Sequence, residues 1–306
     1  MPICEADPWR MQYFQDVVCP PDVRIPTEDF DAYEWNPAHH WVYNKLLVAE
    51  SQGILCAPHG VTPRSYPVFS KPIINLRGMG AGSRLLENLE EYRRHESGGH
   101  FWMTLLRGEH VSSDVAVENG RAVWFRHAQG IPTGEGTFDY WTVHAEAYPD
   151  LERYCGEWLA RNLAGYTGMV NLESIGGRII EAHLRFADQW PDLYGRGWLN
   201  SLVALYARGE WQFTGAARTG YSVVLFGPHG MEYRHPRAER LADLARSAGV
   251  TSIQITFHAH RAAASHAMPP GGFRLAVVNC WDLEAGRRVR AQLAELFGLR
   301  RSALAS

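Results

Sequence analysis

The stretch VNLESIGGRIIEAHLRF, residues 170–186, constrains the fold more than any other part of the sequence. Two apolar runs are joined by Gly176-Gly177, and such a glycine pair favours the tight two-residue turn of a β-hairpin. In an antiparallel strand pair, Glu173 on the first strand can lie next to Glu181 on the second. The sequence therefore predicts a hairpin that brings two carboxylates together.

The second strand of this hairpin carries polar residues at a spacing of two. Residues i, i+2 and i+4 of a strand face the same way, so Glu181, His183 and Arg185 are predicted to share one face. Two carboxylates within about 4–6 Å raise each other's pKa unless a cation lies between them, and Mg²⁺ is a hard cation that prefers oxygen ligands. The alternative, which these residues alone leave open, is a solvated face whose charges form weak surface ion pairs.

Charge and composition exclude several classes of function. The 306 residues carry a formal net charge of −3, which gives no electrostatic reason to expect nucleic acid or an acidic membrane surface as a partner. The first residues, MPICEADPWR, lack the layout of a signal peptide, and no run of about 18 apolar residues would span a membrane. Five scattered cysteines without a C-x-x-C spacing are typical of reduced thiols. We therefore expect a cytoplasmic protein without nucleic-acid or membrane partners.

The order of the predicted elements favours an α+β fold, because strands and helices are mixed without strict βαβ alternation. Residues 1–40 are rich in Pro, Asp and aromatic residues and are expected to be irregular. A helix is predicted from about His40 to Gln52, and another within SRLLENLEEYRRH, where Ser83 would be the N-cap. The remaining predicted elements are strands at 66–76, 100–108, 110–118 and 120–128, a helix at 151–163, the hairpin, a helix at 192–207, a strand at 221–226, a helix at 236–247, strands at 252–258 and 273–281, and a helix at 282–298.

A lysine followed by a glycine-rich loop marks a second candidate site. Lys71 ends an apolar strand and is followed by RGMGAGSR, residues 77–84. Glycines let backbone N–H groups approach phosphate oxygens, and the lysine adds positive charge. The loop matches neither the Walker pattern nor the spacing of a dinucleotide-binding turn, so a plain flexible turn remains the alternative. Lys45, early in the first predicted helix, would by itself be a surface lysine.

Taken in order, these pieces resemble the ATP-grasp superfamily of carboxylate–amine and carboxylate–thiol ligases, in particular its biotin-carboxylase-like branch. The helix with Lys45, the turn GILCAPHG and the strand YPVFSKP are similar to the family's lysine helix, turn and ATP-lysine strand. RGMGAGSRLL resembles its glycine-rich phosphate loop, and LLRGEHVSSDVAVENG resembles its linker and following strand. GYTGMVNLES and IIEAHLRF resemble its metal-ligand strands. The resemblance covers roughly residues 40–190.

The resemblance implies an ATP-grasp fold, in which two α+β lobes clasp a nucleotide. Residues 1–64 would be a truncated N-terminal segment with its connecting helix, and residues 65–108 would be the small lobe with the glycine-rich loop. Residues 109–306 would form the large lobe with the metal-binding strands and a C-terminal α/β extension. The implied activity is that of an ATP-dependent ligase, which activates a small-molecule carboxylate as an acylphosphate and transfers the acyl group to an amine.

The resemblance also assigns nucleotide contacts. The two lysines would contact the phosphates, the loop residues would cover them, a glutamate would lie near the ribose, and two leucines would lie against the adenine. The residues concerned are Lys45, Lys71, Gly78, Gly80, Gly82, Ser83, Leu105, Leu106 and Glu109.

The metal and the reaction centre are implied by the hairpin. Glu173 and Glu181 would hold Mg²⁺ between the β- and γ-phosphates, and Arg185 would stabilise charge on the transferring phosphoryl group. His183 stands where the family pattern has asparagine. An imidazole suits Mn²⁺ or Zn²⁺ better than Mg²⁺, and it can also serve as an acid, a base or an orienting group near pH 7. ATP and Mg²⁺, with Mn²⁺ as the alternative metal, are therefore the implied cofactors.

Two further departures from the family pattern affect the expected function. Met103 and Thr104 stand where the family usually has acids before the linker. The segment before Lys45 is about forty residues long, whereas the family normally has a complete α/β domain there. A second copy of the chain, a partner subunit or residues 190–306 would then complete the substrate side. These departures keep a second hypothesis open, a catalytically degenerate nucleotide-binding protein that acts as a partner subunit or a regulator.

Overall fold

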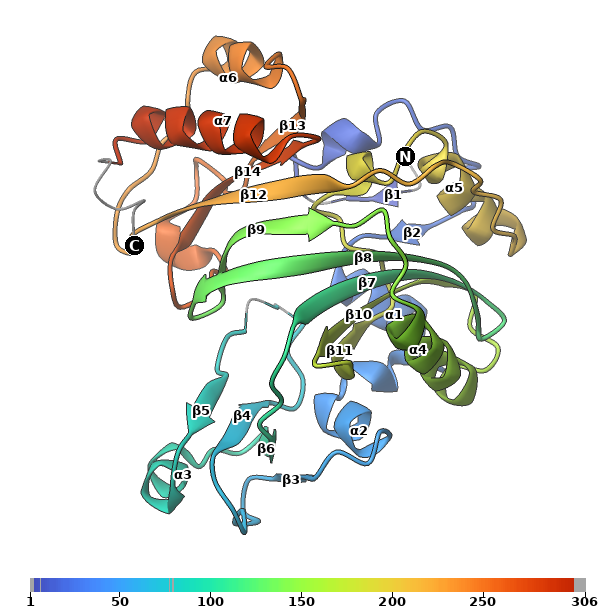
Figure 1. Cartoon of the computed structure of the whole chain (residues 1–306), viewed down its shortest axis with the longest axis vertical. Coiled ribbons are helices and arrows are strands. Elements are labelled where there is room, and N and C mark those ends of the chain that lie inside the picture. Colours follow the sequence, from blue (N-terminus) through green and yellow to red (C-terminus); the bar gives the residue numbers. More distant parts are fainter. Residues whose placement is uncertain (1–2, 6, 77, 79, 300–306) are drawn as a thin grey trace.

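A computed structural model describes residues 3–5, 7–76, 78 and 80–299 (Figure 1). A large sheet lies at the centre, a smaller sheet extends from one end of it, and the N-terminal segment packs beside the C-terminal strands. None of the helices in these ranges combines the length and the apolar character that crossing a membrane requires.

The central sheet has eight strands in the order β11-β10-β7-β8-β9-β12-β14-β13, and every neighbouring pair is antiparallel. Each strand alternates side chains between two covered faces, which explains the abundance of Val and Ile in them. The strands are β7 (His110–Glu118), β8 (Arg121–Gly134), β9 (Thr137–Val143), β10 (Gly168–Ile175), β11 (Arg178–His183), β12 (Gly220–Gly227), β13 (Val250–Ile255) and β14 (Phe273–Cys280).

The predicted hairpin forms the edge of this sheet as β10 and β11. Gly176 and Gly177 connect the strands with φ values of 56° and 76°, so both residues adopt the left-handed conformation that favours glycine in such turns. The register places Glu173 directly opposite Glu181. The predicted proximity of these two residues is confirmed, because directly opposite residues of an antiparallel pair share one face.

The small sheet has four antiparallel strands in the order β3-β6-β4-β5, from β3 (Cys56–Pro58), β6 (His100–Thr104), β4 (Val68–Pro72) and β5 (Arg84–Leu86). The predicted helix starting at Ser83 is wrong in its first part, because residues 84–86 pair with β4 as β5. The helix α3 covers only Leu89–His95, and its N-cap is Asn88, which accepts a hydrogen bond from the Glu91 N–H. β3 falls inside the predicted 1–64 segment, and the domain boundaries themselves stay a prediction.

Helices cover both faces of the central sheet (Figure 1). Apolar residues at helical spacing explain this packing in α4 (Pro149–Asn162), where Leu151, Cys155, Trp158 and Leu159 are buried. The predicted helix 40–52 is divided by Asn44, which follows a 3-10 helix (His40–Tyr43) and caps α2 with its side chain. The helix α2 covers Lys45–Glu50. The other helices after α3 are α5 (Trp198–Arg208), α6 (Ala238–Ala245) and α7 (Leu283–Leu296), with 3-10 turns at Pro191–Leu193 and Ala263–Ser265.

The N-terminal segment is more ordered than its composition predicts. It contains β1 (Ile3–Cys4) paired in parallel with β2 (Ile25–Pro26), a 3-10 turn (Met11–Tyr13) and the helix α1 (Asp29–Trp35). Ile3, Phe14 and Ile25 are buried in the same core as residues of α5. The expectation of an irregular segment holds for most of its described residues and is wrong for these short elements, because apolar residues spaced without periodicity still dock against the large sheet.

Candidate active site

Glu173 and Glu181, which we call the strand acids, each face a cation from another element. Lys45 Nζ, at the first residue of α2, lies 2.6 Å from Glu181 Oε1. His110 Nε2, at the start of β7, lies 3.1 Å from Glu173 Oε2. The hairpin, α2 and β7 therefore place two carboxylates and two basic groups around one point on the sheet edge.

The electrostatic surroundings keep the strand acids ionised. Burial alone would raise the pKa of Glu173, but the hydrogen bond from His110 and the charges of His110, His183 and Lys45 lower this pKa to about 2. Burial and the charge of Glu173 also act to raise the pKa of Glu181, whereas Lys45 leads the positive groups that lower it below its usual range. The pKa of His110 is raised because its bond to Glu173 outweighs burial.

Lys71 reaches from the small sheet to the central sheet. Its side chain is only 2% exposed, and Nζ donates a hydrogen bond to the Ile180 carbonyl oxygen on β11 at 2.8 Å. Burial lowers its pKa from 10.5 to about 8, although Glu181 and Glu173 act in the opposite direction. The one hydrogen bond is to a neutral carbonyl, so the ammonium charge remains available to an anionic ligand.

His183 and Arg185 both contact Asp29, a residue that sequence reasoning missed. His183 Nδ1 lies 3.0 Å from Asp29 Oδ1, and Arg185 donates from Nε and Nη2 to the two carboxylate oxygens at 2.9 and 3.0 Å. These partners lower the pKa of Asp29 despite its burial. The ionised carboxylate indicates that His183 carries its proton on Nδ1, a tautomer inferred from the hydrogen bonds, which leaves Nε2 facing Glu181 at 3.7 Å.

Arg185 lies near His183, as predicted, but not because the two residues alternate along a strand. β11 ends at His183, so Arg185 lies beyond the strand. It reaches the same neighbourhood because Asp29, the first residue of α1, holds both side chains. Asp29 comes from the part of the sequence expected to be irregular, and its signal was the acid-rich start TEDFDAYEW of a helix with aromatic residues.

The glycine-rich loop lies between β4 and β5. Gly78, Gly80 and Gly82 have φ values of 66°, 62° and 78°, a region in which side chains are strained. The Ser83 N–H donates to the Gly80 carbonyl at 3.0 Å. Two residues of the quoted loop, Arg77 and Met79, lie outside the described residues. The phosphate-binding role of the loop stays a prediction.

The linker between β6 and β7 passes directly over the hairpin turn. A Cβ on Gly108 would lie 2.8 Å from the Gly176 Cα, so only glycines permit this approach. Leu105 and Leu106 are half-buried, and Leu106 packs against the apolar cluster of Phe101 and Met103. Glu109 is exposed and lines a groove of about 730 Å³, together with Tyr148, Tyr154 and the hairpin turn. The strand acids and Lys71 do not line this groove, and the adenine and ribose assignments stay predictions.

The strand acids fit a hard divalent cation. Both are held ionised, both offer oxygen donors, and in the described part of the chain Glu173 Oε1 has no hydrogen-bond partner. Mg²⁺ is usually bound in this way, through one or two carboxylates together with substrate phosphates. His183 Nε2 faces the same point with its other nitrogen fixed by a carboxylate, an arrangement typical of metal-binding histidines.

Comparison with solved structures identifies the fold. No family model and no curated protein matches the sequence. The L-amino acid ligase of Bacillus licheniformis matches with a TM-score of 0.63 at 11% identity, over 94% of this chain and 82% of that one. Phosphoribosylamine–glycine ligase of Thermotoga maritima matches with a TM-score of 0.62 at 15% identity, over 93% and 85% of the two chains. Carboxyaminoimidazole ribonucleotide synthase of Aspergillus clavatus, solved in complex with ATP, matches with a TM-score of 0.57 at 10% identity, over 84% and 73%.

The chain therefore has the fold of these ligases, the ATP-grasp fold, which confirms the predicted α+β class and fold. Likeness at this level of identity establishes the fold, and the function has to be argued from the site.

Proposed function

We propose that the protein is an ATP-dependent ligase that activates a carboxylate as an acylphosphate and transfers the acyl group to an amine. One observation carries this proposal: Glu173 and Glu181 lie opposite each other on adjoining strands, with Lys45 and Lys71 converging on them from two other elements. Two ionised carboxylates beside two lysines suit a metal-bound triphosphate, because the lysines can pair with phosphate oxygens while the carboxylates hold the cation.

The nucleotide would lie between the two sheets. Lys71 would exchange its carbonyl partner for a phosphate oxygen, and Lys45 would lie close to both a phosphate and Glu181. The loop residues Gly78, Gly80, Gly82 and Ser83 would cover the phosphates, since backbone N–H groups can approach them there. Leu105 and Leu106 would border the adenine, and Glu109 would approach the ribose. These assignments follow from the resemblance and from the linker's course beside the hairpin.

The reaction has two displacements. An oxygen of the substrate carboxylate attacks the γ-phosphorus, the bond to the β-phosphate oxygen breaks, and ADP leaves. The amine nitrogen then attacks the acyl carbon, the carbon–oxygen bond to phosphate breaks, inorganic phosphate leaves, and the nitrogen loses a proton. Arg185, oriented by Asp29, stabilises negative charge beside the transferring group, and His183 is an orienting or metal-binding residue.

Mg²⁺ held by Glu173 and Glu181 would neutralise charge on the phosphates, and Mn²⁺ is the alternative because of His183. The partners expected from this chemistry are a small-molecule carboxylate and an amine. A second copy of the chain or a partner subunit remains a way to complete the N-terminal side. The described N-terminal segment itself contributes Asp29 to the site.

A second function, a degenerate nucleotide-binding protein, is favoured by one feature. Thr104 is exposed and Met103 is buried at the end of β6, where the resembling family usually has acids. Neither side chain replaces a carboxylate's hydrogen bonds to a nucleotide. Tight ATP binding without turnover would support this alternative.

The test is ADP release with Mg²⁺, ATP and candidate carboxylates and amines, in the unchanged protein and in Glu181→Gln. The control is Glu239→Gln, because Glu239 is an exposed acid in the first turn of α6. We expect substrate-dependent ADP release that Glu181→Gln removes and Glu239→Gln retains. Equal rates in both variants would exclude the proposed role of the strand acids.

A further inference from the structure

The N-terminal segment meets the end of the hairpin at one buried carboxylate, Asp29. It is only 4% exposed, and both of its oxygens accept hydrogen bonds from groups whose donor role is unambiguous. Arg185 donates from Nη2 to Oδ2 at 3.0 Å, and its Nε lies 2.9 Å from Oδ1. The Tyr43 hydroxyl accepts from the Leu184 N–H at 3.1 Å, so its own proton is donated to Oδ1 at 3.2 Å. Asp29 is therefore an acceptor at both oxygens.

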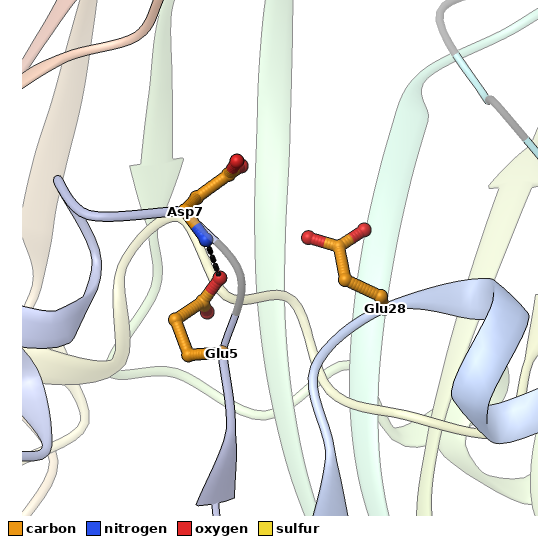
Figure 2. Close-up of side chains that lie close together, drawn as sticks. All are labelled: Glu5, Asp7 and Glu28. Carbon is orange, nitrogen blue, oxygen red and sulfur yellow. Dashed lines mark hydrogen bonds between the residues drawn. The ribbon is translucent and has the colours of Figure 1, made fainter. Parts of the chain in front are cut away.

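Ion pairs hold the start of α1 in this position. Arg10 Nη1 lies 3.2 Å from Glu28 Oε1 and 3.0 Å from Asp7 Oδ2, and it also contacts Asp188, in the chain beyond β11. Figure 2 shows the carboxylates of Glu28 and Asp7 on two stretches of the N-terminal segment. One guanidinium therefore ties the start of α1 to the chain that follows the hairpin, and Asp29 is the next residue after Glu28.

His183, the last residue of β11, is the third group that contacts Asp29. Its Nδ1 lies 3.0 and 3.1 Å from the two carboxylate oxygens, and the residue is 4% exposed. Because these oxygens accept from Arg185 and Tyr43 as well, the hydrogen bonds assign the proton to Nδ1. In the neutral ring the lone pair is then on Nε2, and the ring cannot turn without breaking this contact.

The free nitrogen of His183 is directed at one of the strand acids. Nε2 lies 3.7 Å from Glu181 Oε2, which is too long for a hydrogen bond. Lys45 binds the other oxygen, Oε1, and among the described residues Glu181 Oε2 makes no hydrogen bond. Two donors that each bind the same ion at about 2.1 Å lie about 3–4 Å apart. The separation therefore suits two ligands of one metal ion.

We propose that Asp29 is a positioning residue that makes His183 Nε2 a ligand of the metal held by the strand acids, so that this site prefers a first-row transition-metal ion to Mg²⁺. Mg²⁺ takes oxygen ligands, whereas an imidazole nitrogen suits transition metals. A carboxylate on the other ring nitrogen orients such a ligand and raises its basicity. The asparagine that the resembling family has at this position would offer an oxygen instead. The inference rests on the proposed function, because the strand acids hold the same metal.

The test of ligation is pulsed electron paramagnetic resonance of Mn²⁺ bound to the full chain with a non-hydrolysable ATP analogue. The protein is labelled with ¹⁵N, which separates its nitrogens from those of the unlabelled nucleotide. We expect a ¹⁵N coupling to Mn²⁺ in the unchanged protein and in Glu239→Gln. His183→Asn should bind Mn²⁺ without this coupling, because an amide oxygen replaces the imidazole nitrogen.

The test of metal preference is the ratio of the Kd for Mg²⁺ to the Kd for Mn²⁺, measured by calorimetry with the same nucleotide analogue. His183→Asn should lower this ratio roughly 10-fold. Asp29→Asn should lower it too and weaken the ¹⁵N coupling, because the amide can donate to Nδ1 and so favour the tautomer protonated on Nε2. Asp29→Asn added to His183→Asn should leave the ratio unchanged. A purely structural Asp29 would weaken both metals without changing their ratio.

Three results would overturn the inference. In the first, Mn²⁺ binds and is lost in Glu181→Gln, but no ¹⁵N coupling is seen; the metal site of the proposed ligase would then stand without His183. In the second, the coupling persists in His183→Asn. In the third, Asp29→Asn changes neither the coupling nor the ratio. If thermal unfolding shows that Asp29→Asn does not fold, Asp29→Glu replaces it, because the longer side chain displaces the carboxylate. A failure of Mn²⁺ to bind with nucleotide would overturn both this inference and the proposed function.

Discussion

The strand acids and a second group of carboxylates are both half-buried, and they differ in the charges that face them. The second group, which we call the N-terminal cluster, consists of Glu5, Asp7, Glu28 and Asp188. Lys45, Lys71, His110 and His183 surround the strand acids, so the pKa values of those acids fall. Among the described residues, Arg10 is the one guanidinium that forms ion pairs with the N-terminal cluster. Burial and the charge of Asp188 raise the pKa values of Glu5 and Glu28.

Burial acts to raise the pKa in both regions, and nearby positive charge outweighs it only at the strand acids. The strand acids are ionised before any ligand arrives, which suits ligands for a cation that enters with phosphates. The raised pKa values of Glu5 and Glu28 favour the protonated forms of these two acids in the folded protein. The two regions therefore differ in their charge state, and the proposed metal site lies at the strand acids alone.

The largest expected effect separates the two regions kinetically. Glu181→Gln should lower kcat for ADP formation on the order of 10²–10³-fold, because it removes a group that acts on the transferring phosphates. Glu28→Gln should lower kcat much less, because Glu28 pairs with Arg10 and makes no contact with the strand acids among the described residues. Steady-state ADP release measures both. A loss of kcat in Glu28→Gln as large as that in Glu181→Gln would show that the two regions act as one site.

The second prediction concerns the two lysines. Lys45 is paired with Glu181, so Lys45→Met removes the direct ion pair of this half-buried carboxylate and should destabilise the fold by roughly 3 kcal/mol. Lys71 is 2% exposed and carries a charge that burial disfavours, so Lys71→Met should leave stability unchanged or increase it by about 1–3 kcal/mol at pH 7.

Both lysine variants should bind ATP about 10- to 100-fold more weakly. Urea unfolding and calorimetry with ATP measure the two quantities. A stability loss in Lys71→Met equal to that in Lys45→Met would show that Lys71 is compensated in the free protein.

The third prediction is the pH dependence of stability. The pKa values of Glu5 and Glu28 are raised from 4.5 to about 8 and about 7, so the folded state binds more protons than the unfolded state between those values. Their contribution to the free energy of unfolding is therefore present at low pH and is lost as pH rises from about 4.5 to about 8. The strand acids act in the opposite sense, because their lowered pKa values contribute stability above pH 4.5 that is lost under acidic conditions.

Urea unfolding from pH 5 to pH 8.5 tests this difference. The Glu5→Gln variant should lose less stability across the range than the unchanged protein does. An identical profile in the two proteins would mean that Glu5 is already compensated.

The smallest expected effect lies in the loop proposed to cover the phosphates. Gly80→Ala meets no atom within 4 Å and carries only the strain of its positive φ, about 1 kcal/mol. Gly82→Ala adds a Cβ 3.1 Å from Pro72 Cγ and 3.2 Å from His100 Nε2, so it should destabilise the fold slightly more. Thermal unfolding and ATP titration of the pair measure this. Weaker ATP binding in both variants is expected, whereas unchanged binding in both would argue against the loop's role.

The sequence predicted the strand acids because their geometry is local. Two glycines fix a two-residue turn, and the turn fixes the register that places Glu173 opposite Glu181. The family resemblance supplied the rest of that site, including the lysines. The fold class followed from the mixture of strands and helices, whereas the helix expected at Ser83 failed because residues 84–86 are recruited into an edge pairing with β4.

The groups that the sequence did not predict all depend on contacts between distant residues. Asp29 lies 154 residues from His183 in the chain, and no periodicity joins them. The N-terminal cluster likewise combines residues of the first segment with Asp188. Only the folded arrangement brings these charges together, because their positions are set by how the N-terminal segment docks on the sheet.

The most direct test of the central claim is a crystal structure with Mn²⁺ and a non-hydrolysable ATP analogue, with the metal located by its anomalous scattering. The account predicts Mn²⁺ bound to oxygens of Glu173 and Glu181, with phosphate oxygens bonded to Lys71, which would have left the Ile180 carbonyl. Mn²⁺ among Glu5, Asp7 and Glu28, or a nucleotide bound elsewhere while Lys71 keeps its present partner, would contradict it.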